Sequence, residues 1–530
     1  MGRCRERDDA DRPTRRPDVL VVGAGGSGAA LAARLSEDPG RTVLVLEAGP
    51  VPRFPPGFPA ELLDARLVPG ARPETRVVRA YPAHLTPDLP YTAVRGRVLG
   101  GSTTVNGGYF IRARREDFDR WSARAGDALW AYERVLPFLR GLETDLDFGA
   151  TSVHGGRGPI RVGRTDLRHP AAEAFRAAAR ELGHPDEPDK NAQGAPGFGP
   201  VPTNTAGGER INTGTAYLLG ALGRPNLTVV GDCSVRSVVI DRDRATGVVA
   251  DRNGRRTVLE AGEIVLCAGS FASPHLLHLS GIGPAKVLAR AGVPLVQDLP
   301  AVGAALSDHP QVVLEWTPRR PMGGPPGSWL GGALHLSSSG GGHPGDLEIL
   351  QSLVPMAGLV GGRATVPGRP LALLASVQTP RTGGRLRTVS ADPRVPPRIE
   401  YGYLETAADR HRLREAVRAT AALLSTAAFG EVSAGVVEPG PRAVEDDHLL
   451  DRWFRARLGT SQHTCGTVPM GRADDPSAAV DAHGRVYGVS GLRVADTSIL
   501  PAAPLRGPAA TAVLIGELIA HAIGTNAPGR

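Results

Sequence analysis

Two short apolar runs near the N-terminus predict neighbouring strands of a buried parallel sheet. Val19 to Val22 leads directly into a group of glycines, and Val43 to Leu46 is a second run that alternates Val and Leu. Between them, Ala29 to Leu35 has the composition of a helix. Two strands and a helix in so short a segment predict a βαβ unit, the crossover that parallel strands require.

Helical spacing of apolar residues recurs in four later segments. These are Glu116 to Leu139, Ala171 to Leu182, Ala407 to Leu424 and Thr511 to Ile523. Glu517 and His521 interrupt the last segment, which therefore predicts a buried amphipathic helix. No stretch of the sequence approaches the roughly 18 uninterrupted apolar residues that a membrane span needs.

Alternating or short apolar runs predict strands elsewhere. The segments are Asn226 to Asp241, Thr257 to Cys267, Leu347 to Val354 and Leu371 to Gln378. Turns rich in Gly, Pro and Ser separate the runs between residues 311 and 398, so this region predicts an antiparallel sheet with few helices. By composition, Ser337 to Gly345 is a flexible loop, and Arg53 to Tyr91 is an extended, lid-like excursion.

The composition is that of a globular protein, with 530 residues of which 41% are hydrophobic and 22% charged. The net charge of +7 comes almost entirely from arginine, because lysine occurs only at Lys190 and Lys286. Either a coding bias toward arginine or attraction to an acidic partner or anionic membrane surface explains this charge. No basic run interleaves with aromatic residues, which argues against nucleic-acid binding.

The four cysteines stand far apart and form no CxxC pair, so they indicate neither a disulfide framework nor a metal site. This usage favours a reducing, cytoplasmic location. Residues 1–17 are charged and rich in Pro and Arg, and predict a disordered tail. The apolar run that follows Arg15 and Arg16 is too short for the core of a signal peptide.

The first glycine group carries the strongest chemical signal. Gly23, Gly25 and Gly28 form a GxGxxG pattern after a strand and at the start of a helix. Gly23 permits a tight turn, Gly25 allows close approach of a pyrophosphate, and Gly28 allows the helix to pack on the strand. Glu47, at the end of the second strand, can accept hydrogen bonds from a ribose. Together they predict a dinucleotide site, without distinguishing FAD from NAD.

Three further segments contain residues typical of ligand loops. In 96–108, paired glycines and Asn106 suit a ligand loop or a purely structural one. In 269–284, a glycine turn precedes a helix that we expect to begin near Ser273 and Pro274, either as a nucleotide contact or as an ordinary connection. In 461–471, His463 lies in a loop rich in Gly, Thr and Pro; a lone histidine of this kind is more often structural.

In this order and spacing, the four motifs resemble those of the glucose–methanol–choline (GMC) oxidoreductases, over nearly the whole chain from Asp18 to about Ile523. The stretches 109–121 (YFIRARREDFDRW), 308–310 (DHP) and 494–501 (VADTSILP) belong to the same resemblance. It implies bound FAD and a fold of the α/β and α+β classes, in which a Rossmann-type FAD-binding domain is interleaved with a substrate domain built on an antiparallel sheet.

We expect the FAD-binding domain to comprise 18–150, 205–310 and 456–530, the last part including a C-terminal helix. The substrate domain would comprise 151–204 and 311–455. The cofactor-binding residues that the motifs and the resemblance imply are Gly23, Gly25, Gly28, Glu47, Gly100, Gly101, Ser102, Asn106, Val235, Asp496, Pro508 and Thr511. No metal is implied.

His463 matches the catalytic histidine of the family, which implies that it takes the hydroxyl proton while a hydride leaves the carbon. Two departures from the family pattern matter. Val105 stands where members with covalently attached flavin commonly have histidine, so we expect non-covalent FAD. Gly507 stands where most members have a second catalytic Asn or His. The pair is reduced to His463 unless another group substitutes.

The segments 106–110 (NGGYF), 143–148 (ETDLDF), 461–463 (SQH) and 506–508 (RGP) are most similar to GMC oxidoreductases of the mycofactocin system. This resemblance implies oxidation of mycofactocinol, the reduced form of a peptide-derived redox cofactor. Electrons would pass to an acceptor that the sequence does not identify, toward the respiratory chain, in the cytoplasm or at the inner face of the cell membrane. The alternative is direct oxidation of a small alcohol or choline-like compound. Under either reading we expect His309, His275 and His278 to be structural or flavin-adjacent, and Cys465 to be a small buried filler.

Overall fold

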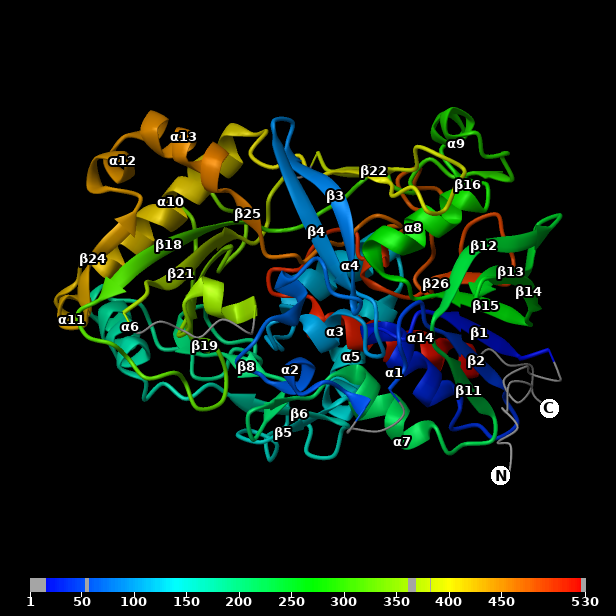
Figure 1. Ribbon diagram of the computed structural model, residues 1–530, viewed down its shortest axis with the longest axis horizontal. Helices are drawn as coiled ribbons and strands as arrows, with labels where there is room; N and C mark the ends of the chain where they lie inside the picture. The colour runs from blue at the N-terminus through cyan, green and yellow to red at the C-terminus, as the bar shows by residue number, and fades with distance from the viewer. Residues whose placement is uncertain (1–15, 53–56, 361–367, 382, 526–530) are drawn as a thin grey trace, which may run out of the picture.

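A five-stranded parallel sheet forms one half of the computed structural model, which describes residues 16–52, 57–360, 368–381 and 383–525. Its strands are, in spatial order, β11 (Leu227–Val230), β2 (Val43–Leu46), β1 (Val19–Val22), β15 (Glu263–Leu266) and β26 (Leu492–Val494). The predicted βαβ unit is confirmed, because α1 (Gly26–Leu35) connects β1 and β2, which pair in parallel. Distant parts of the chain therefore meet in this sheet (Figure 1).

Helix α14 (Ala509–Thr525) packs against α1 and confirms the predicted buried C-terminal helix. The contact is close: a Cβ on Gly516 would lie 2.2 Å from the Ser27 carbonyl oxygen. Glu517, the polar interruption in this helix, accepts hydrogen bonds from Arg34 (2.8 Å) and Tyr217 (2.7 Å). Among the described residues, we find no helix with the length and apolar character needed to cross a bilayer.

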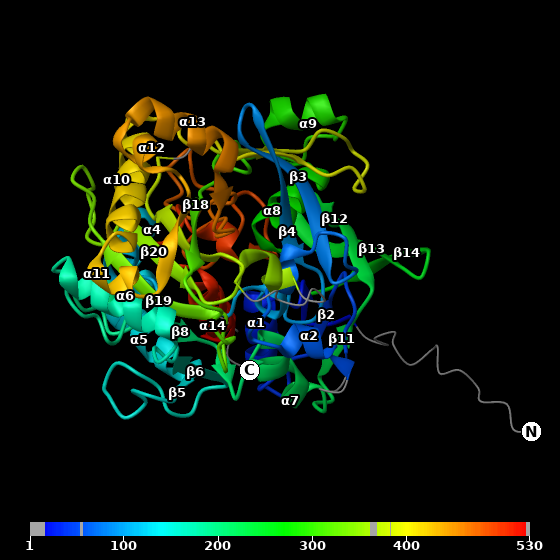
Figure 2. The same ribbon diagram turned by 60° about the vertical axis from the view of Figure 1, so that its left-hand side comes forward.

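The other half contains a seven-stranded, largely antiparallel sheet, as the sequence predicts for residues 311–398 (Figures 1 and 2). In spatial order the strands are β24 (Ser433–Glu438), β18 (Pro310–Pro318), β21 (Leu371–Val377), β20 (Leu347–Ser352), β19 (Leu330–Leu336) and β7 (Phe198–Pro200), and β25 (Gly459–Thr460) also pairs with β18. The predicted helices are confirmed as α6 (Pro170–Glu181) and α10 (Ala407–Leu424), and both contact this sheet.

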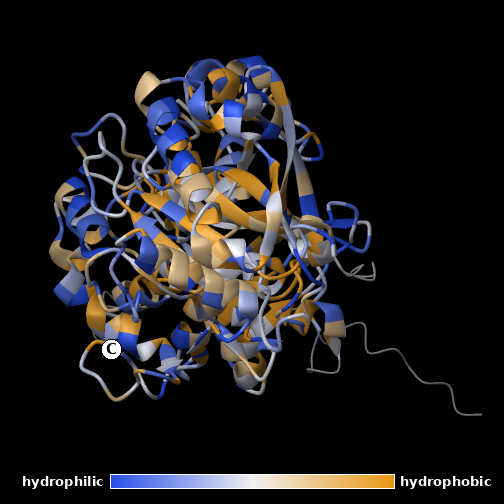
Figure 3. Cartoon of the chain, turned by 90° about the vertical axis from the view of Figure 1, so that its left-hand side faces the viewer, coloured by the Kyte–Doolittle hydropathy of each residue, from blue (hydrophilic) through white to orange (hydrophobic). Residues whose placement is uncertain are grey.

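Alternation along these strands gives the sheet two different faces. On β20, Leu347 and Ile349 join the apolar core beneath α6 and α10. Glu348 and Leu350 point to the opposite face, where they line an internal cavity. Hydrophobic residues dominate the interior strands, and hydrophilic ones the outer helices (Figure 3). The fold therefore places one face of the antiparallel sheet opposite the carboxyl ends of the parallel strands.

Three predicted segments differ in the structure. Residues 116–139 form two helices, α4 (Arg115–Ala125) and α5 (Tyr132–Gly141), because Gly126 ends α4 in the left-handed region (φ 64°). Residues 226–241 are divided between β11 and β12 (Cys233–Asp241), with Asp232 at φ 49° between them. Residues 257–267 are likewise divided between β14 (Arg255–Glu260) and β15.

The extended excursion predicted for 53–91 contains regular elements that the sequence pattern does not predict, and its lid-like role stays a prediction; residues 53–56 lie outside the described residues. This segment includes β3 (Val78–Thr86), which pairs with β4 (Leu89–Gly96) as an antiparallel hairpin. With β22 (Arg385–Arg387) and β23 (Arg398–Glu400) they form a four-stranded sheet, so pairing that is remote in sequence orders a segment with weak local signals.

Helix α8 begins at Gly269 rather than near Ser273 (Gly269–Leu279). Pro274 lies inside the helix and has no N–H to donate to the Ser270 carbonyl. That carbonyl instead accepts from the Thr467 hydroxyl at 2.7 Å, so it keeps a hydrogen bond although the proline cannot donate one. At the start of α8, the Asp496 carboxylate accepts from the Gly269 amide (2.9 Å).

The remaining elements are short or peripheral. They are α2 (Ala60–Leu63), η2 (Pro69–Ala71), α3 (Ser102–Val105), η3 (Ala128–Trp130), β5 (Glu143–Asp145), β6 (Ile160–Arg164), β8 (Pro202–Thr203), β9 (Thr205–Ala206), β10 (Glu209–Arg210), η4 (Gly214–Leu218), α7 (Leu219–Ala221), β13 (Arg244–Arg252), β16 (Ile282–Gly283), α9 (Ala285–Ala291), β17 (Gln297–Asp298), η5 (Met356–Val360), α11 (Ala427–Gly430), α12 (Pro441–Glu445), α13 (Asp447–Arg457) and η6 (Thr497–Ile499).

Arg16 and Pro17, which the composition places in the disordered tail, belong to the fold. The Gly262 amide donates to the Pro17 carbonyl at 2.9 Å, and Arg16 donates to the Ala261 carbonyl at 2.6 Å. Residues 1–15 of the predicted tail lie outside the described residues. The division of the chain into domains stays a prediction.

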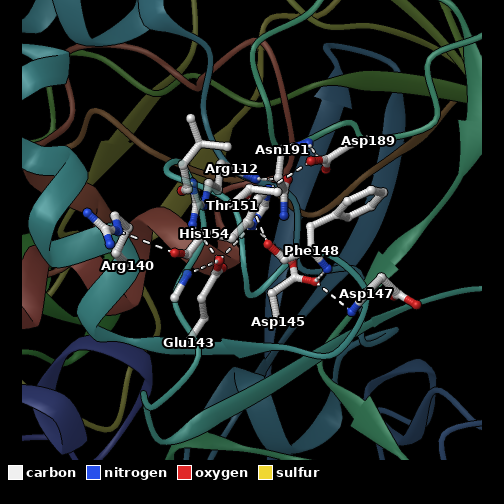
Figure 4. A network of polar contacts seen from close by, with 12 residues as sticks. Arg112, Arg140, Glu143, Asp145, Asp147, Phe148, Thr151, His154, Asp189 and Asn191 are labelled. Atoms are coloured by element: carbon white, nitrogen blue, oxygen red, sulfur yellow. Dashed lines mark hydrogen bonds and ion pairs between the residues drawn. The ribbon is translucent and has the colours of Figure 1, made fainter.

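A buried network of ion pairs holds together the segments around 143–148 (Figure 4). Its carboxylates are Glu143, Asp145 and Asp189, and its cations are Arg112, Arg164 and His154. His154 is at the centre: Nδ1 lies 2.8 Å from Glu143 and 2.9 Å from Asp145, and Nε2 lies 2.8 Å from Asp189. Both ring nitrogens therefore act as donors, which requires the protonated imidazolium.

The charges of this network balance without a metal ion. Burial lowers the pKa of His154, but the hydrogen bonds to Asp145, Asp189 and Glu143 raise it to about 10 overall. Arg112 pairs with Glu143 at 2.5 Å. Three positive groups thus neutralise three carboxylates. A divalent cation among Glu143, Asp145 and His154 would have to displace a bound proton and approach two guanidinium groups, so ion pairing accounts for the cluster.

Replacing His154 with Gln should destabilise the protein, because three carboxylates, two of them fully buried, would keep only two cations. Breaking a buried pair of this kind typically costs about 3–5 kcal/mol. Equilibrium unfolding in urea measures this, with the exposed His448→Gln as the matched control. Because the folded pKa lies above the unfolded one, the contribution of His154 is complete below about pH 6.5 and is lost as pH rises through about 10. A difference between the two variants that does not shrink over this range would contradict the assignment.

Candidate functional site

A cavity of about 540 Å³ runs between the two sheets. One end is formed by the glycine turn after β1, and the other by the inner face of the antiparallel sheet. It is where the carboxyl ends of parallel strands meet a crevice, the usual ligand position in open α/β sheets. The cavity therefore brings together segments from the beginning, middle and end of the chain.

The glycine turn is closely packed for reasons that its sequence pattern predicts. Gly23 has φ 103°, and a Cβ there would lie 2.6 Å from the Cys267 carbonyl oxygen. A Cβ on Gly28 would lie 2.0 Å from the Gly23 carbonyl oxygen. Gly25 lines the cavity at the N-terminus of the ten-residue helix α1. Backbone amides with a favourable helix dipole thus face this end of the cavity.

Glu47 lies buried beside this turn and lines the cavity. One carboxylate oxygen accepts from the Ala24 amide (3.0 Å) and the other from the Gly49 amide (2.9 Å). Burial raises the pKa of Glu47, and the two amides oppose that rise. Each oxygen retains a lone pair, so the carboxylate can also accept from a ligand hydroxyl.

The predicted loop at 96–108 packs directly on the first turn. A Cβ on Gly101 (φ 53°) would lie 2.7 Å from Gly25 Cα, so two glycine backbones touch here. Gly101, Ser102 and Asn106 line the cavity. Gly100 (φ 85°) is not among the lining residues and donates to the Ala24 carbonyl at 2.8 Å, which holds the two loops together.

The remaining predicted cofactor residues come from three distant segments. Val235, Asp496 and Pro508 line the cavity. Asp496 also accepts from the Ser273 hydroxyl (2.5 Å), so its side chain fixes the start of α8. Thr511 is not among the lining residues; it is buried in α14, and its hydroxyl has no hydrogen-bond partner among the described residues.

His463 lines the far half of the cavity, on the loop that follows β25. The Asp308 carboxylate fixes this loop by accepting from the His463 amide (2.8 Å) and the Thr464 hydroxyl (2.6 Å). Burial lowers the pKa of His463 to about 4, an effect that Glu348 opposes and Arg95 reinforces. At neutral pH the imidazole is therefore uncharged and can accept a proton.

A hydrogen bond between two imidazoles fixes which nitrogen of His463 is free. His309 Nε2 lies 2.9 Å from the Pro504 carbonyl, which only accepts, so Nε2 carries the hydrogen of this neutral ring. His309 Nδ1 is then an acceptor, and it lies 2.9 Å from His463 Nδ1. His463 must donate from Nδ1, which leaves a lone pair on its Nε2. His309 thus positions His463 from outside the cavity.

Gly507 lies directly against the free nitrogen of His463. A Cβ on Gly507 would be 3.3 Å from both Nε2 and Cε1 of that imidazole. The structure therefore brings together the two positions that the family pattern pairs, and only one of them has a side chain. Space remains beside the lone pair.

Sequence reasoning missed Glu348, a buried carboxylate on the cavity face of β20. Its Oε2 atom accepts from the Tyr109 hydroxyl (3.0 Å) and from His335 Nε2 (2.9 Å). Burial raises the pKa of Glu348, but the hydrogen bond from His335 lowers it to about 2 overall, so the group is ionised. A charged residue within the apolar run 347–354 was the available signal.

The histidines on α8 share one hydrogen-bond partner, and His275 also lines the cavity, so their expected role as structural or flavin-adjacent residues stays a prediction. His275 and His278 lie 2.9 Å and 3.0 Å from the same Thr388 hydroxyl. Cys465 is fully buried, and burial raises the pKa of its thiol well above the usual value. A protonated thiol is a poor nucleophile, which agrees with the expected role as a buried filler.

Comparison with known proteins identifies the family. Two GMC oxidoreductase family models match residues 18–311 and 380–516. An uncharacterized GMC-type oxidoreductase in the thcA 5' region of Rhodococcus erythropolis is 40% identical over 94% of this chain and 97% of its own length. An oxygen-dependent choline dehydrogenase of Rhizobium rhizogenes is 34% identical over 96% of this chain and 95% of its own.

Solved structures agree with this relationship. Pyridoxine 4-oxidase from Mesorbium loti superimposes with a TM-score of 0.89 at 27% identity, over 97% of this chain and all of that one. A formate oxidase shares the fold with a TM-score of 0.85 at 23% identity, over 96% of this chain and 98% of that one. The chain therefore belongs to the GMC oxidoreductases, and it is an FAD-dependent enzyme that acts on CH–OH groups.

Proposed function

We propose that His463 is the catalytic base for dehydrogenation of an alcohol. The observation that supports this most strongly is the lone pair on His463 Nε2, fixed by His309 and directed to the space beside Gly507. In the reaction, Nε2 accepts the hydroxyl proton as a hydride leaves the carbinol carbon, and the product is a carbonyl compound. The charge of Glu348 favours the imidazolium that forms, because it raises the pKa of His463.

The residues present fit FAD as the hydride acceptor. The backbone of Gly25 and Gly26 at the N-terminus of α1 suits a pyrophosphate, and the buried Glu47 carboxylate suits a ribose. We assign Gly23, Gly28, Gly100 and Thr511 to the packing that shapes this part of the site. When bound, FAD supplies the two-electron acceptor for the hydride. Val105 offers no nucleophile for covalent attachment, so denaturation should release the flavin.

The proposed natural substrate is mycofactocinol. Support comes from the similarity of segments 106–110, 143–148, 461–463 and 506–508 to the mycofactocin-system enzymes, and from Gly507 in place of a second catalytic side chain. Electrons would then pass toward the respiratory chain, with the enzyme in the cytoplasm or at the inner face of the membrane. The second candidate is a small alcohol, which the choline dehydrogenase relatives favour.

Anaerobic addition of mycofactocinol should bleach the flavin absorbance of the purified enzyme, because hydride transfer reduces the cofactor. The same measurement with choline and simple alcohols is the comparison. Bleaching by the simple alcohols alone would discard mycofactocinol and leave the second candidate. Release of hydrogen peroxide under air then separates an oxidase from a dehydrogenase.

Replacing His463 with Ala should slow flavin reduction by about 10²–10⁴-fold while FAD stays bound, because a positioned base is lost. His309→Ala should slow flavin reduction by about tenfold, which is less than in His463→Ala, because the His463 imidazole remains but its tautomer is no longer fixed. Stopped-flow absorbance measures both, with the exposed His448→Ala as control. Unchanged reduction in His463→Ala would remove its assignment as the base.

Replacing Gly28 with Ala should abolish FAD binding, because the new Cβ would lie 2.0 Å from the Gly23 carbonyl oxygen and disrupt the turn. Gly220→Ala is the matched control: Gly220 also lies in a helix, and nothing is found within 4 Å of its added Cβ. The ratio of flavin to protein absorbance after purification distinguishes the two. Full flavin content in Gly28→Ala would show that the turn does not hold the cofactor.

A further inference from the structure

Glu348 is a charged group on the part of the cavity wall that the antiparallel sheet forms. Trp329, Leu350 and Leu374 line the same region and belong to one apolar cluster. Strand alternation directs Glu348 to this face, and only 1% of the residue is accessible. Carboxylates are rarely buried unless their charge and lone pairs are satisfied, so its partners decide its role.

The partners of Glu348 saturate one carboxylate oxygen. Tyr109 and His335 both donate to Oε2. His335 can donate from Nε2 because its Nδ1 faces the Lys190 ammonium at 3.1 Å, and an ammonium only donates. Lys190 is itself paired with Glu187 at 2.7 Å. This buried series of side chains fixes both the ionisation and the orientation of Glu348.

The other oxygen, Oε1, makes no hydrogen bond within the part of the chain that the structure describes. Trp329 uses its indole N–H on the Gly107 carbonyl at 2.9 Å. Arg506 also acts on Glu348 and lowers its pKa, but the hydrogen bonds that its Nη1 makes go to the Gly345 and Leu505 carbonyls. A carboxylate oxygen that faces a ligand cavity without a protein donor is an acceptor available to the ligand.

Glu348 and His463 both line the cavity, and the charge of Glu348 raises the pKa of His463. Their tasks differ. His463 is neutral and has a lone pair for the reacting hydroxyl, whereas Glu348 is already ionised and held by two donors. Glu348 is therefore suited to bind a second polar group of the substrate rather than to take the reacting proton.

We propose that Glu348 is a specificity-determining residue whose Oε1 accepts a hydrogen bond from a second donor on the substrate. The preferred substrates are then alcohols that bear a further hydroxyl or a protonated amine. This inference rests on the proposed alcohol oxidation at His463. It extends that proposal by stating what the non-reacting end of the substrate must carry.

Matched alcohols test the inference in the FAD-loaded enzyme. Propanol is compared with propanediol and aminopropanol, and benzyl alcohol with its hydroxy and aminomethyl derivatives. We expect kcat/KM for flavin reduction to be at least about 100-fold higher for a donor-bearing member, since a site built for a hydrogen bond discriminates against analogues that lack it. Comparing the hydroxyl derivatives with the amine derivatives shows which of the two donors Glu348 prefers. Choline, whose cation has no N–H, should behave like an alcohol without a second donor.

Glu348→Gln is the decisive variant because it keeps the shape and the oxygen that faces His335, but presents an amide N–H₂ to the cavity. We expect the preference for donor-bearing alcohols over their donor-free partners to fall to within about threefold. Reduction by donor-free alcohols should slow as well, because the charge that favours the His463 imidazolium is lost, so the ratio within each matched pair is the diagnostic quantity. Glu315→Gln, on strand β18 of the same sheet and not among the cavity-lining residues, is the control and should keep the preference. FAD content of each variant verifies the fold.

The outcomes separate the two proposals. If no alcohol reduces the wild-type flavin, the proposed function fails and this inference fails with it. Alcohols could be oxidised with equal kcat/KM for the donor-bearing and donor-free member of every pair, or Glu348→Gln could keep the preference. Either result would overturn only the role of Glu348. If choline were oxidised as fast as aminopropanol, charge attraction rather than hydrogen bonding would explain the preference. That result would also overturn the proposed role of Glu348. If mycofactocinol alone is oxidised, Glu348→Gln should lower its kcat/KM at least about 100-fold, and an unchanged value would overturn the inference.

Discussion

The hydrogen bond between His309 and His463 is the interaction on which the proposed chemistry of this site depends. It joins the start of β18, the loop after β25 and the Pro504 carbonyl into one unit. Because the Pro504 carbonyl oxygen only accepts, His309 donates to it and accepts from His463 Nδ1. The other nitrogen of His463, which faces Gly507, therefore keeps its lone pair. The backbone of 504–507 therefore both sets the tautomer of the imidazole and leaves space beside it.

Around this unit, the protein separates two kinds of buried charge. In the network of His154, all three carboxylates are neutralised internally, and the cluster stabilises the fold without facing the cavity. Around Glu348, internal partners satisfy one oxygen and leave the other directed to the cavity wall. Buried carboxylates thus stabilise the fold around His154, whereas at Glu348 we propose that a carboxylate binds the substrate. The difference is that protein donors reach every carboxylate of the His154 network but only one oxygen of Glu348.

Membership in the GMC oxidoreductases explains the general chemistry, but this chain departs from the family pattern at the point where the reaction would occur. Gly507 offers no group to hold the substrate oxygen. Elsewhere on the cavity wall, the antiparallel sheet supplies a carboxylate through Glu348 on β20. Substrate selection in this chain would then depend on the sheet that faces the flavin site rather than on a second catalytic side chain.

By itself, the sequence determined the features that depend on residues close together along the chain. The strand–glycine–helix unit, the positions of Gly23, Gly28 and Glu47, and the helices over 171–182 and 407–424 all follow from local backbone preference and apolar periodicity. The glycine positions are especially predictable, because a side chain at Gly28 would collide with a carbonyl only five residues earlier. The motif around His463 identified the histidine, again from contiguous residues.

Only the tertiary structure decided the contacts between segments that are far apart. The hairpin β3–β4 is ordered by pairing with β23, and α8 accommodates Pro274 because Thr467 satisfies the Ser270 carbonyl. His309 reaches His463 across 154 residues of sequence, and Glu348 faces the cavity because of its position on the sheet. The physical reason is the same in each case: local sequence fixes the conformation of a segment, whereas sheet register and packing decide which side chains meet.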